Sequence, residues 1–256
     1  MPLLSVFIYV IQRGVSSVNW NFFTQLPTPV GETGGGMGNA LLGTAWLVGL
    51  ASLVGVPWGI AAGVYLSEYG RGKLATTLRF VTDLMTSIPS IIIGLFAYAL
   101  IVLPMKRFSV LAGAASLAVI MIPVVTRTTE ELLKLVPVHI REAGLALGLP
   151  RWKVTLRIVL RGSMGGIATG VMLAVARVAG ETAPLLFTAF SNRFWNRGLD
   201  QPTASLPVQI YTYAISPYED WHRQAWAGAL VLVLFVFVLN LTTRLVLRRQ
   251  TGGRDG

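Results

Sequence analysis

The chain alternates long apolar stretches with short polar segments. Five stretches approach the ~20 residues that a helix needs to cross a bilayer. They are predicted at about 40–66, 80–104, 109–126, 162–190 and 226–247. Long, nearly uncharged runs of this kind are typical of membrane-spanning helices. The sequence therefore predicts an all-α membrane protein with several spans.

A shorter apolar segment precedes these spans. It comprises residues 3–12, LLSVFIYVIQ, and ends at Arg13. It lacks the basic start and small-residue cleavage site of a signal peptide. We therefore expect about six spans, of which the first has lost its N-terminal part. The expected organisation is an incomplete first span and outer segment at 1–37, a transmembrane domain at 38–247 and a polar cytoplasmic tail at 248–256.

Composition agrees with a membrane location. Of the residues 54% are hydrophobic and 12% are charged, and the mean hydropathy of +0.64 is too high for an ordinary soluble domain. The chain has no cysteine, which excludes disulfides and thiolate metal sites, and His139 and His222 form no metal-ligand pattern. Because no GxxxxGK[ST] phosphate loop is present, the chain itself is not expected to hydrolyse ATP.

The net charge of +10 arises from basic residues at the ends of apolar stretches. Most of them fall on one side of an alternating topology, which the positive-inside rule makes cytoplasmic. The segment 19–38 has no basic residue and is predicted to lie outside, with its glycines forming a flexible turn. The predicted cytoplasmic residues are Arg71, Lys73 and Arg79 in 67–79, then Arg127, Lys134, Arg141, Arg151, Lys153, Arg157 and Arg161 in 127–161, and Arg244, Arg248, Arg249 and Arg254 in the tail.

The long cytoplasmic segment contains a predicted helix–turn–helix unit at 136–160. Pro137 can begin the first helix, Gly148 can end it, and Pro150 can begin the second. A DNA-binding helix-turn-helix has this outline, but the unit is held closely between two membrane spans, which argues against DNA binding. A basic patch that contacts anionic lipid head groups is an alternative interpretation.

The same segment resembles the EAA loop of ABC-type importer permeases. In that family Glu-Ala-Ala is followed by three residues and a Gly, and nine residues later by Ile-x-Leu-Pro. Gly144 replaces the second Ala here, and Arg161 stands in place of the Pro. The resemblance implies that residues 137–152 dock into a cleft of an ATPase subunit, with Glu142, Ala143, Gly144 and Gly148 at the contact. The positions that match the pattern are Glu142, Ala143, Gly148, Ile158 and Leu160.

The run ARVAGETAPLLFT at 176–188 places Arg177 and Glu181 in apolar surroundings. On an α-helix both would lie on the side that carries a stripe of small residues suited to close helix packing. Because charge is costly in the membrane, the pair is expected to face protein or a water-filled path rather than lipid. The stripe consists of Gly162, Gly166, Gly170 and Ala174.

Arg177 and Glu181 are spaced so that they can also contact each other. One interpretation is a structural ion pair, although desolvation makes a buried ion pair a poor stabiliser. The interpretation that we favour leaves the arginine available to an oxyanion, because its planar fork can donate two hydrogen bonds to phosphate-like oxygens. Glu181 would hold and neutralise it when no anion is present. Pro184 is expected to break or kink the helix, and Thr182 and Thr188 add hydroxyl donors.

The run ARVAGETAPLLFTAF resembles the fifth-span signature of the PstA-type permeases of phosphate importers. The similarity covers about residues 30–245. In that family the charged residues of this span are implicated in phosphate passage. By position, the resemblance implies this role for Arg177 and Glu181, with Thr182 beside them as a candidate pathway residue. Other similar segments are GNALLGTAWLV at 38–48, VPWGIAAGVYLSEYG at 56–70 and DLMTSIPSIIIGLFAY at 83–98.

The resemblance implies a type I ABC importer transmembrane fold in the cytoplasmic (inner) membrane of a prokaryote, and no covalent chemistry or bound cofactor on this chain. The implied partners are a second, PstC-type permease, two PstB-type ATPase subunits that bind ATP and Mg, a PstS-type extracytoplasmic phosphate-binding protein, inorganic phosphate and the lipid bilayer. Two alternatives stay open: an ABC permease for sulfate, molybdate or phosphonate, and an ATP-independent transporter or channel that uses Arg177 and Glu181 as an ion or proton relay.

Three further features carry expectations. Glu68 and Asp83 flank the first cytoplasmic loop and are expected to be solvated or interfacial. Pro89, in the sequence Ile-Pro-Ser, is expected to kink a span. The expected aromatic anchors at the outer membrane surface are Trp195, Trp221 and Trp226.

Overall fold

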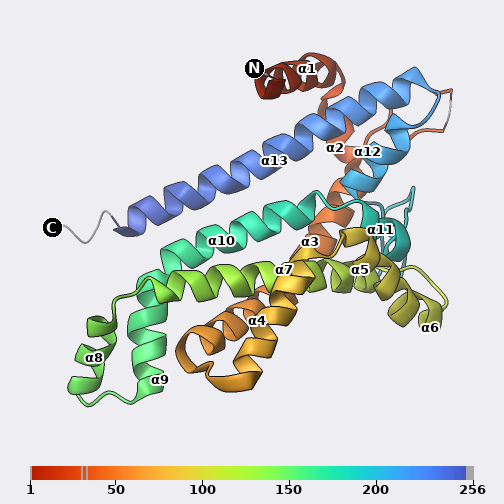
Figure 1. Cartoon of the computed structure of the whole chain (residues 1–256). Coiled ribbons are helices and arrows are strands. Elements are labelled where there is room, and N and C mark those ends of the chain that lie inside the picture. Colours follow the sequence, from red (N-terminus) through yellow and green to blue (C-terminus); the bar gives the residue numbers. More distant parts are fainter. Residues whose placement is uncertain (1, 30, 33, 252–256) are drawn as a thin grey trace. The chain divides into compact units, whose positions relative to one another are not determined.

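The computed structural model describes residues 2–29, 31–32 and 34–251, and the regular elements of these residues are helices, without a strand (Figure 1). The chain divides into two compact units. Unit 1 comprises Met1–Ala51, Pro89–Leu117 and Arg177–Val238, and unit 2 comprises Ser52–Ile88, Ala118–Ala176 and Leu239–Gly256.

Four helical stretches are long and apolar enough to cross a membrane. They are Gly38–Tyr69, Val110–Lys134, Arg151–Ala179 and Glu219–Thr242. The helices Gly72–Ser87 and Ser90–Met105 are long and apolar enough to cross a membrane only when they are taken together as one broken span. The described residues therefore supply up to five spans, each overlapping a predicted one. The short apolar segment at the start forms α1, Pro2–Gly14, whose 13 residues are too few to span.

Unit 1 contains both short and interrupted helices. One cluster of its buried residues consists of Phe22, Met37, Ala40, Ala204, Leu206, Tyr213, Ala225 and Ala227. The elements are α1, η1 (Val15–Ser17), α2 (Trp20–Thr24), α5 (Ser90–Ala97), η3 (Tyr98–Val102), α6 (Leu103–Met105), α11 (Ala183–Thr188), α12 (Leu206–Ala214), and parts of α3 (Gly38–Val64), α7 (Val110–Lys134) and α13 (Glu219–Thr251).

Unit 2 contains the predicted cytoplasmic loops at 67–79 and 127–161. One cluster of its buried residues consists of Leu133, Val154, Val159 and Ile167. The elements are η2 (Tyr65–Tyr69), α4 (Gly72–Ser87), α8 (Val138–Ala146), α9 (Arg151–Val154), η4 (Thr155–Leu160), most of α10 (Arg161–Ala179), and the remaining parts of α3, α7 and α13. The segments η2, η3 and η4 are single π-helical turns within longer helices.

In unit 2, a row of glycines on α3 lies against α7. A Cβ atom added to Gly59 would lie 2.6 Å from the Cβ of Val125, closer than real Cβ atoms approach each other. Glycine is therefore needed for this separation, as at many helix contacts in membranes. The facing pairs are Gly55–Met121, Gly59–Val125 and Gly63–Thr129.

A second glycine row, on α10, also faces α7 within unit 2. A Cβ on Gly170 would lie 2.2 Å from the Cγ2 of Thr128, and one on Gly166 would lie 3.0 Å from a methyl group of Leu132. The close packing predicted for this small-residue stripe is confirmed at both positions. Gly162, by contrast, has no neighbour within 4 Å of its added Cβ.

Several predicted span boundaries are wrong in an instructive way. α7 continues to Lys134 rather than ending near 126, and a continuous helix runs from Arg151 into α10. The predicted loop at 127–161 is therefore reduced to 135–150. Hydropathy reports where side chains become polar, but a helix can continue beyond that point when a charged residue is buried and paired, as Glu130 is here.

The predicted span at 80–104 is not one helix. α4 ends at Ser87, and Ile88 and Pro89 have extended backbone conformations before α5 begins at Ser90. Proline disfavours a helical conformation in the residue before it, which explains why the helix stops at this place. The expected interruption at Pro89 is confirmed, but it separates two helices instead of kinking one.

We predict opposite effects for two glycine-to-alanine changes on α3. Gly59→Ala should lower the free energy of unfolding by about 1–3 kcal/mol, because the new methyl group would overlap Val125. Gly49→Ala adds the same methyl group where nothing lies within 4 Å, so it should leave stability unchanged or raise it by up to about 1 kcal/mol through helix propensity. Thermal unfolding of the purified variants in detergent measures both; equal midpoints would contradict the packing argument.

Candidate functional site

The predicted span at 162–190 is interrupted between its two charged residues, Arg177 and Glu181. α10 ends at Ala179 and α11 begins at Ala183, so Arg177 lies in the last helical turn and Glu181 lies in the non-helical break. The expectation that both occupy one continuous helix is wrong. Pro184 lies in the first turn of α11, where its missing N–H costs nothing. The chain leaves the helix earlier, at Gly180.

The position of the break is fixed by packing within unit 1. Pro184 is buried, and a Cβ atom on Gly94 of α5 would lie 2.5 Å from the Pro184 Cα. Thr188 is also buried, and its hydroxyl donates to the Pro184 carbonyl at 2.8 Å. Its hydroxyl is thus committed to its own helix. Thr182 precedes α11, and its side chain makes no capping hydrogen bond.

Arg177 and Glu181 form a loose ion pair. The Arg177 Nε lies 3.9 Å from the Glu181 Oε1, and the two side chains are 49% and 15% exposed. This separation exceeds a hydrogen bond. Among the residues described, no acceptor is hydrogen-bonded to the Arg177 guanidinium. The pair is therefore brought together as predicted, yet the arginine keeps its donors accessible.

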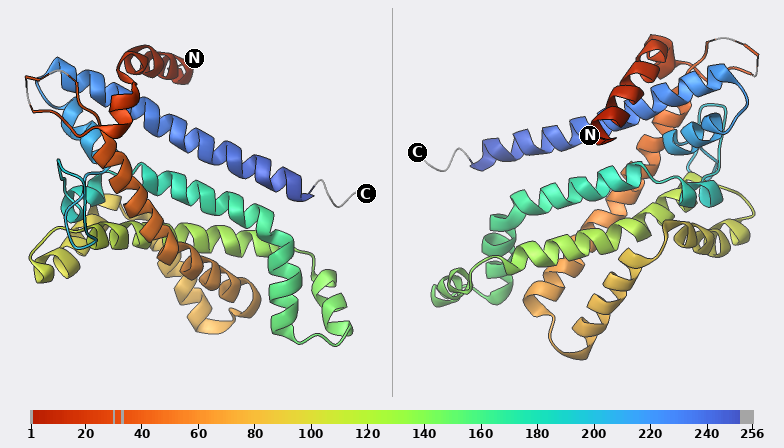
Figure 2. Two further views of the ribbon diagram at one scale, coloured as in Figure 1. Left: turned by 180° about the vertical axis from the view of Figure 1, so that it is seen from behind. Right: turned by 45° about the horizontal axis from the view of Figure 1, so that its top comes forward.

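The predicted helix–turn–helix unit is present in unit 2. α8 and α9 lie side by side in every view (Figures 1 and 2), joined by a turn at Gly148 with φ of +77°. Such a left-handed conformation at a helix end favours glycine. Gly144 is buried, and its added Cβ would lie 2.9 Å from the Ile158 Cδ1. Gly144 therefore allows the two arms of the unit to approach each other closely.

The outer surface of this unit is uncovered. Glu142 and Ala143 are exposed, and they lie among large apolar side chains that no described residue of the chain covers. Leu147 is the most exposed, at 82%. Apolar residues gathered on one surface indicate a contact with another molecule. Within residues 137–152, the exposed large apolar residues are Val138, Ile140, Leu145, Leu147 and Trp152.

The inner side of the unit is anchored to η2 by charge. Arg141 donates to both carboxylate oxygens of Glu68, from Nη2 to Oε1 at 2.8 Å and from Nε to Oε2 at 3.2 Å. It also donates to the carbonyl oxygens of Leu133 and Val136. The Glu68 side chain is only 7% exposed. The expectation that Glu68 is solvated is therefore wrong, because a bidentate arginine replaces its water.

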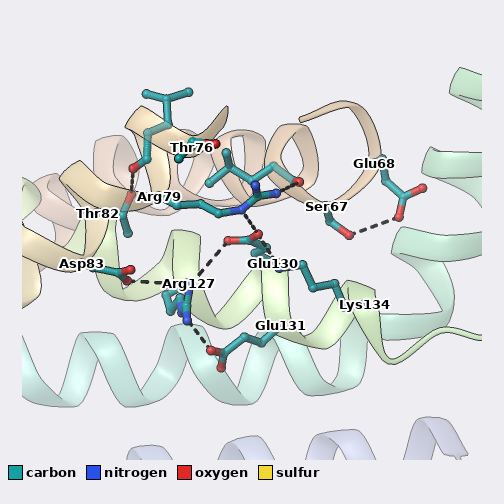
Figure 3. A network of polar contacts seen from close by, with 12 residues as sticks. Ser67, Glu68, Thr76, Arg79, Thr82, Asp83, Arg127, Glu130, Glu131 and Lys134 are labelled. Atoms are coloured by element: carbon teal, nitrogen blue, oxygen red, sulfur yellow. Dashed lines mark hydrogen bonds and ion pairs between the residues drawn. The ribbon is translucent and has the colours of Figure 1, made fainter. Parts of the chain in front are cut away.

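A second buried carboxylate, Glu130 of α7, joins α4 and α7 (Figure 3). Its side chain is 1% exposed, and its Oε1 accepts hydrogen bonds from Arg79 Nε and Lys134 Nζ, both at 2.6 Å. Arg79 also donates to the carbonyl of Leu66 at 2.7 Å.

At the edge of this network, Arg127 contacts Glu131 at 2.8 Å and Asp83 at 3.7 Å (Figure 3). The Asp83 side chain is 58% exposed, which agrees with its expected interfacial position.

Neither the Arg79–Glu130 pair nor the Glu68–Arg141 pair was predicted from the sequence. The i,i+4 spacing of Glu130 and Lys134 was a visible signal for a helical pair. The remaining partners are 51 and 73 residues apart in the chain, so no local spacing relates them. Trp221, predicted as an outer anchor, stacks on Tyr213 with ring centroids 4.4 Å apart.

Comparison with known proteins places this architecture in a family. Residues 55–252 match the family described as "Binding-protein-dependent transport system inner membrane component". The "Phosphate transport system permease protein PstA" of Yersinia pestis is 45% identical over 249 residues, which cover 97% of this chain and 84% of that protein. The chain belongs to this family, among the PstA-type permeases. The PstA protein of Haemophilus influenzae is 49% identical over 242 residues, covering 94% and 86%.

Solved structures agree on the fold of this PstA-type permease. A structure of the MetNI methionine ABC transporter in an inward-facing conformation has a TM-score of 0.64, with 17% identity, and covers 94% of this chain and 96% of that one. An amino acid ABC transporter has a TM-score of 0.57 at 16% identity, covering 81% and 89%. The fold is that of a type I ABC importer transmembrane domain. The PstA-type chain is thus a multi-pass protein of the prokaryotic cytoplasmic (inner) membrane, as predicted.

We predict that two neighbouring glutamates of α7 contribute very differently to stability. Glu130→Gln should cost about 1.5–3 kcal/mol, because it weakens two charge-assisted hydrogen bonds at a buried carboxylate. Glu131→Gln removes the same charge from a side chain that is 60% exposed, so its cost should stay below about 1 kcal/mol. Thermal unfolding in detergent distinguishes them. Similar losses for both variants would show that burial of Glu130 has no energetic role.

Proposed function

We propose that this chain is the permease subunit of an ATP-driven phosphate importer and forms part of the phosphate path. The observation that carries the proposal is the accessible Arg177 guanidinium, in the last turn of α10 beside the non-helical break, in a chain whose relatives at 45% and 49% identity are named phosphate permeases. A planar guanidinium without a bound acceptor is suited to a tetrahedral oxyanion.

The Arg177–Glu181 pair differs from the buried ion pairs of the same chain, which supports this use of Arg177. Where this chain needs a structural carboxylate–guanidinium pair, the contact is short and buried, as in Arg79–Glu130 at 2.6 Å and Arg141–Glu68 at 2.8 Å. The Arg177–Glu181 contact is 3.9 Å, and the arginine is half exposed. Glu181 therefore balances the arginine charge without occupying its donors, and Thr182 adds a hydroxyl beside it.

The coupling role falls to the α8–α9 unit. We propose that residues 137–152 dock into an ATPase partner, through Glu142, Ala143 and the exposed apolar side chains around Leu147. Two copies of a PstB-type ATPase would bind ATP and Mg, and their closure would push on this unit. A PstC-type permease would form the other half of the path, and a PstS-type binding protein would deliver phosphate from outside.

Removing the Arg177 fork tests the proposed path. Arg177→Gln should lower ATP-driven phosphate uptake at least about a hundredfold, because it removes charge-assisted hydrogen bonds worth about 1.5–3 kcal/mol each, while complex assembly stays normal. Uptake is measured in cells that lack their own importer permease, with arsenate, sulfate and molybdate as competitors. Arg223→Gln, at an exposed surface pair with Asp220, is the matched control. Normal uptake by Arg177→Gln would remove Arg177 from the path.

Charge reversal on the coupling unit tests the ATPase contact. Glu142→Lys should detach the ATPase subunit or uncouple ATP hydrolysis from uptake, because the exposed glutamate would lie at the contact. Glu32→Lys makes the same change in a segment predicted to lie outside and should have no effect. Co-purification of the ATPase and phosphate uptake are measured for both variants. If Glu142→Lys retains both, the docking role is refuted.

A further inference from the structure

A cavity of about 270 Å³ lies inside unit 2, between η2 and the α8–α9 unit. It lies on the side of the coupling unit that faces η2, and of the exposed apolar residues proposed for docking it shares only Val138 among its lining residues. Positively charged side chains dominate its wall, with Glu68 as the one acidic residue among those lining it. The charged lining residues are Glu68, Arg71, Lys134, Arg141 and Arg151.

The charges around this cavity are not balanced. Arg141 is matched by Glu68, and Lys134 is bonded to Glu130 at 2.6 Å. Arg151 donates to the backbone carbonyl of Glu68 and lies over the Tyr69 ring, 5.2 Å from its centroid. Arg71 is exposed. Within the described part of the chain, neither Arg71 nor Arg151 has a carboxylate partner.

We propose that this cavity binds a phosphate group, and that the bound group restrains the coupling unit. Arg71 belongs to the turn that joins η2 to α4, whereas Arg151 is the first residue of α9. Both line the same cavity, so an anion between them would tie α9 to that turn. Arginine is well suited to such a ligand because its fork matches phosphate oxygens.

This site would make uptake subject to inhibition by its product, imported phosphate. The inference rests on the proposed phosphate-import function. The cavity is built from segments predicted to be cytoplasmic, where imported phosphate accumulates. A tie between α9 and the η2–α4 turn opposes displacement of the unit on which the ATPase would push. The same phosphate chemistry could come from an anionic lipid head group at the membrane surface, and the experiment separates these two sources.

The test uses the complete importer in vesicles whose lumen represents the cytoplasm and contains ATP. Initial uptake of radiolabelled phosphate is measured with the lumen free of added phosphate or loaded with it, and sulfate loading at equal ionic strength controls for salt. Vesicles are made from neutral phosphatidylcholine alone or with anionic phosphatidylglycerol. The variants are Arg71→Gln and its control Lys73→Gln, which removes the same charge from the start of α4 outside the cavity lining.

We expect luminal phosphate to slow uptake by the unaltered importer in neutral vesicles. The concentration for half-inhibition, relative to each variant's own uninhibited rate, should rise about tenfold in Arg71→Gln and stay unchanged in Lys73→Gln. A tenfold change corresponds to about 1.4 kcal/mol, in the range of one charge-assisted hydrogen bond. Inhibition by phosphatidylglycerol instead, again dependent on Arg71, would assign the phosphate group to lipid.

Hydrogen exchange in the peptide that contains residues 137–154 gives a local readout that does not depend on uptake. Inorganic phosphate or phosphatidylglycerol should slow exchange there in the Lys73→Gln complex but not in the Arg71→Gln complex. Equal responses of both variants, or no response to either ligand, would overturn the inference. Loss of the ATPase subunit from the Arg71→Gln complex alone would show that a protein, not an anion, occupies the cavity, and would also overturn it.

The two readouts separate this inference from the proposed function. Arg71-dependent protection by inorganic phosphate, in a complex that imports no phosphate, would support the site and reject phosphate import. Phosphate import without any such protection would support the proposed function and reject the site.

Discussion

The close approach of α7 to its neighbours is the constraint on which unit 2 depends. Lipid tails are as apolar as leucine, so helices in a bilayer associate through close packing and buried polar contacts rather than through the hydrophobic effect. Glycines on α3 and on α10 permit that packing on α7, where added Cβ atoms at Gly59 and Gly170 would lie 2.6 Å and 2.2 Å from α7 side chains. Glu130 of the same helix supplies the buried polar contact, to Arg79 of α4. Close helix packing and buried charge pairing therefore both hold α7 to its neighbours in unit 2.

The chain uses the same pair of chemical groups for two purposes, and distance with exposure decides which. A carboxylate and a guanidinium that are removed from water need short, complete hydrogen bonding to offset desolvation. Arg141 meets this requirement at Glu68 with a bidentate contact. Arg177 is left at 3.9 Å from Glu181 and half exposed, a geometry that contributes little to stability but keeps donors available. The loose pair is therefore the one suited to a transported anion.

Patterns that are local in sequence predicted much of this molecule, and contacts distant in sequence escaped prediction. Apolar length located the spans, and the Pro137–Gly148–Pro150 spacing located the helix–turn–helix unit. The break after Ala179 was misplaced, since Pro184 marks where a helix can restart but not where the preceding one ends. Glu68 was misjudged because its partner, Arg141, is 73 residues away. Residue type alone cannot show whether a carboxylate near a membrane boundary will meet such a partner.

The anchoring of the coupling unit offers a physical route for force through unit 2. Arg141 of the unit holds Glu68 in η2, and the neighbouring Leu66 carbonyl accepts a hydrogen bond from Arg79, which also binds Glu130 of α7. Each link is short and charge-assisted, so displacement of α8 cannot leave η2 and α4 unaffected without breaking a buried contact. α7 is one continuous helix from Val110 to Lys134, with residues in both units. Because Glu130 fixes this helix to Arg79 of α4, a displacement of α8 that reaches η2 and α4 would also strain the contact at α7.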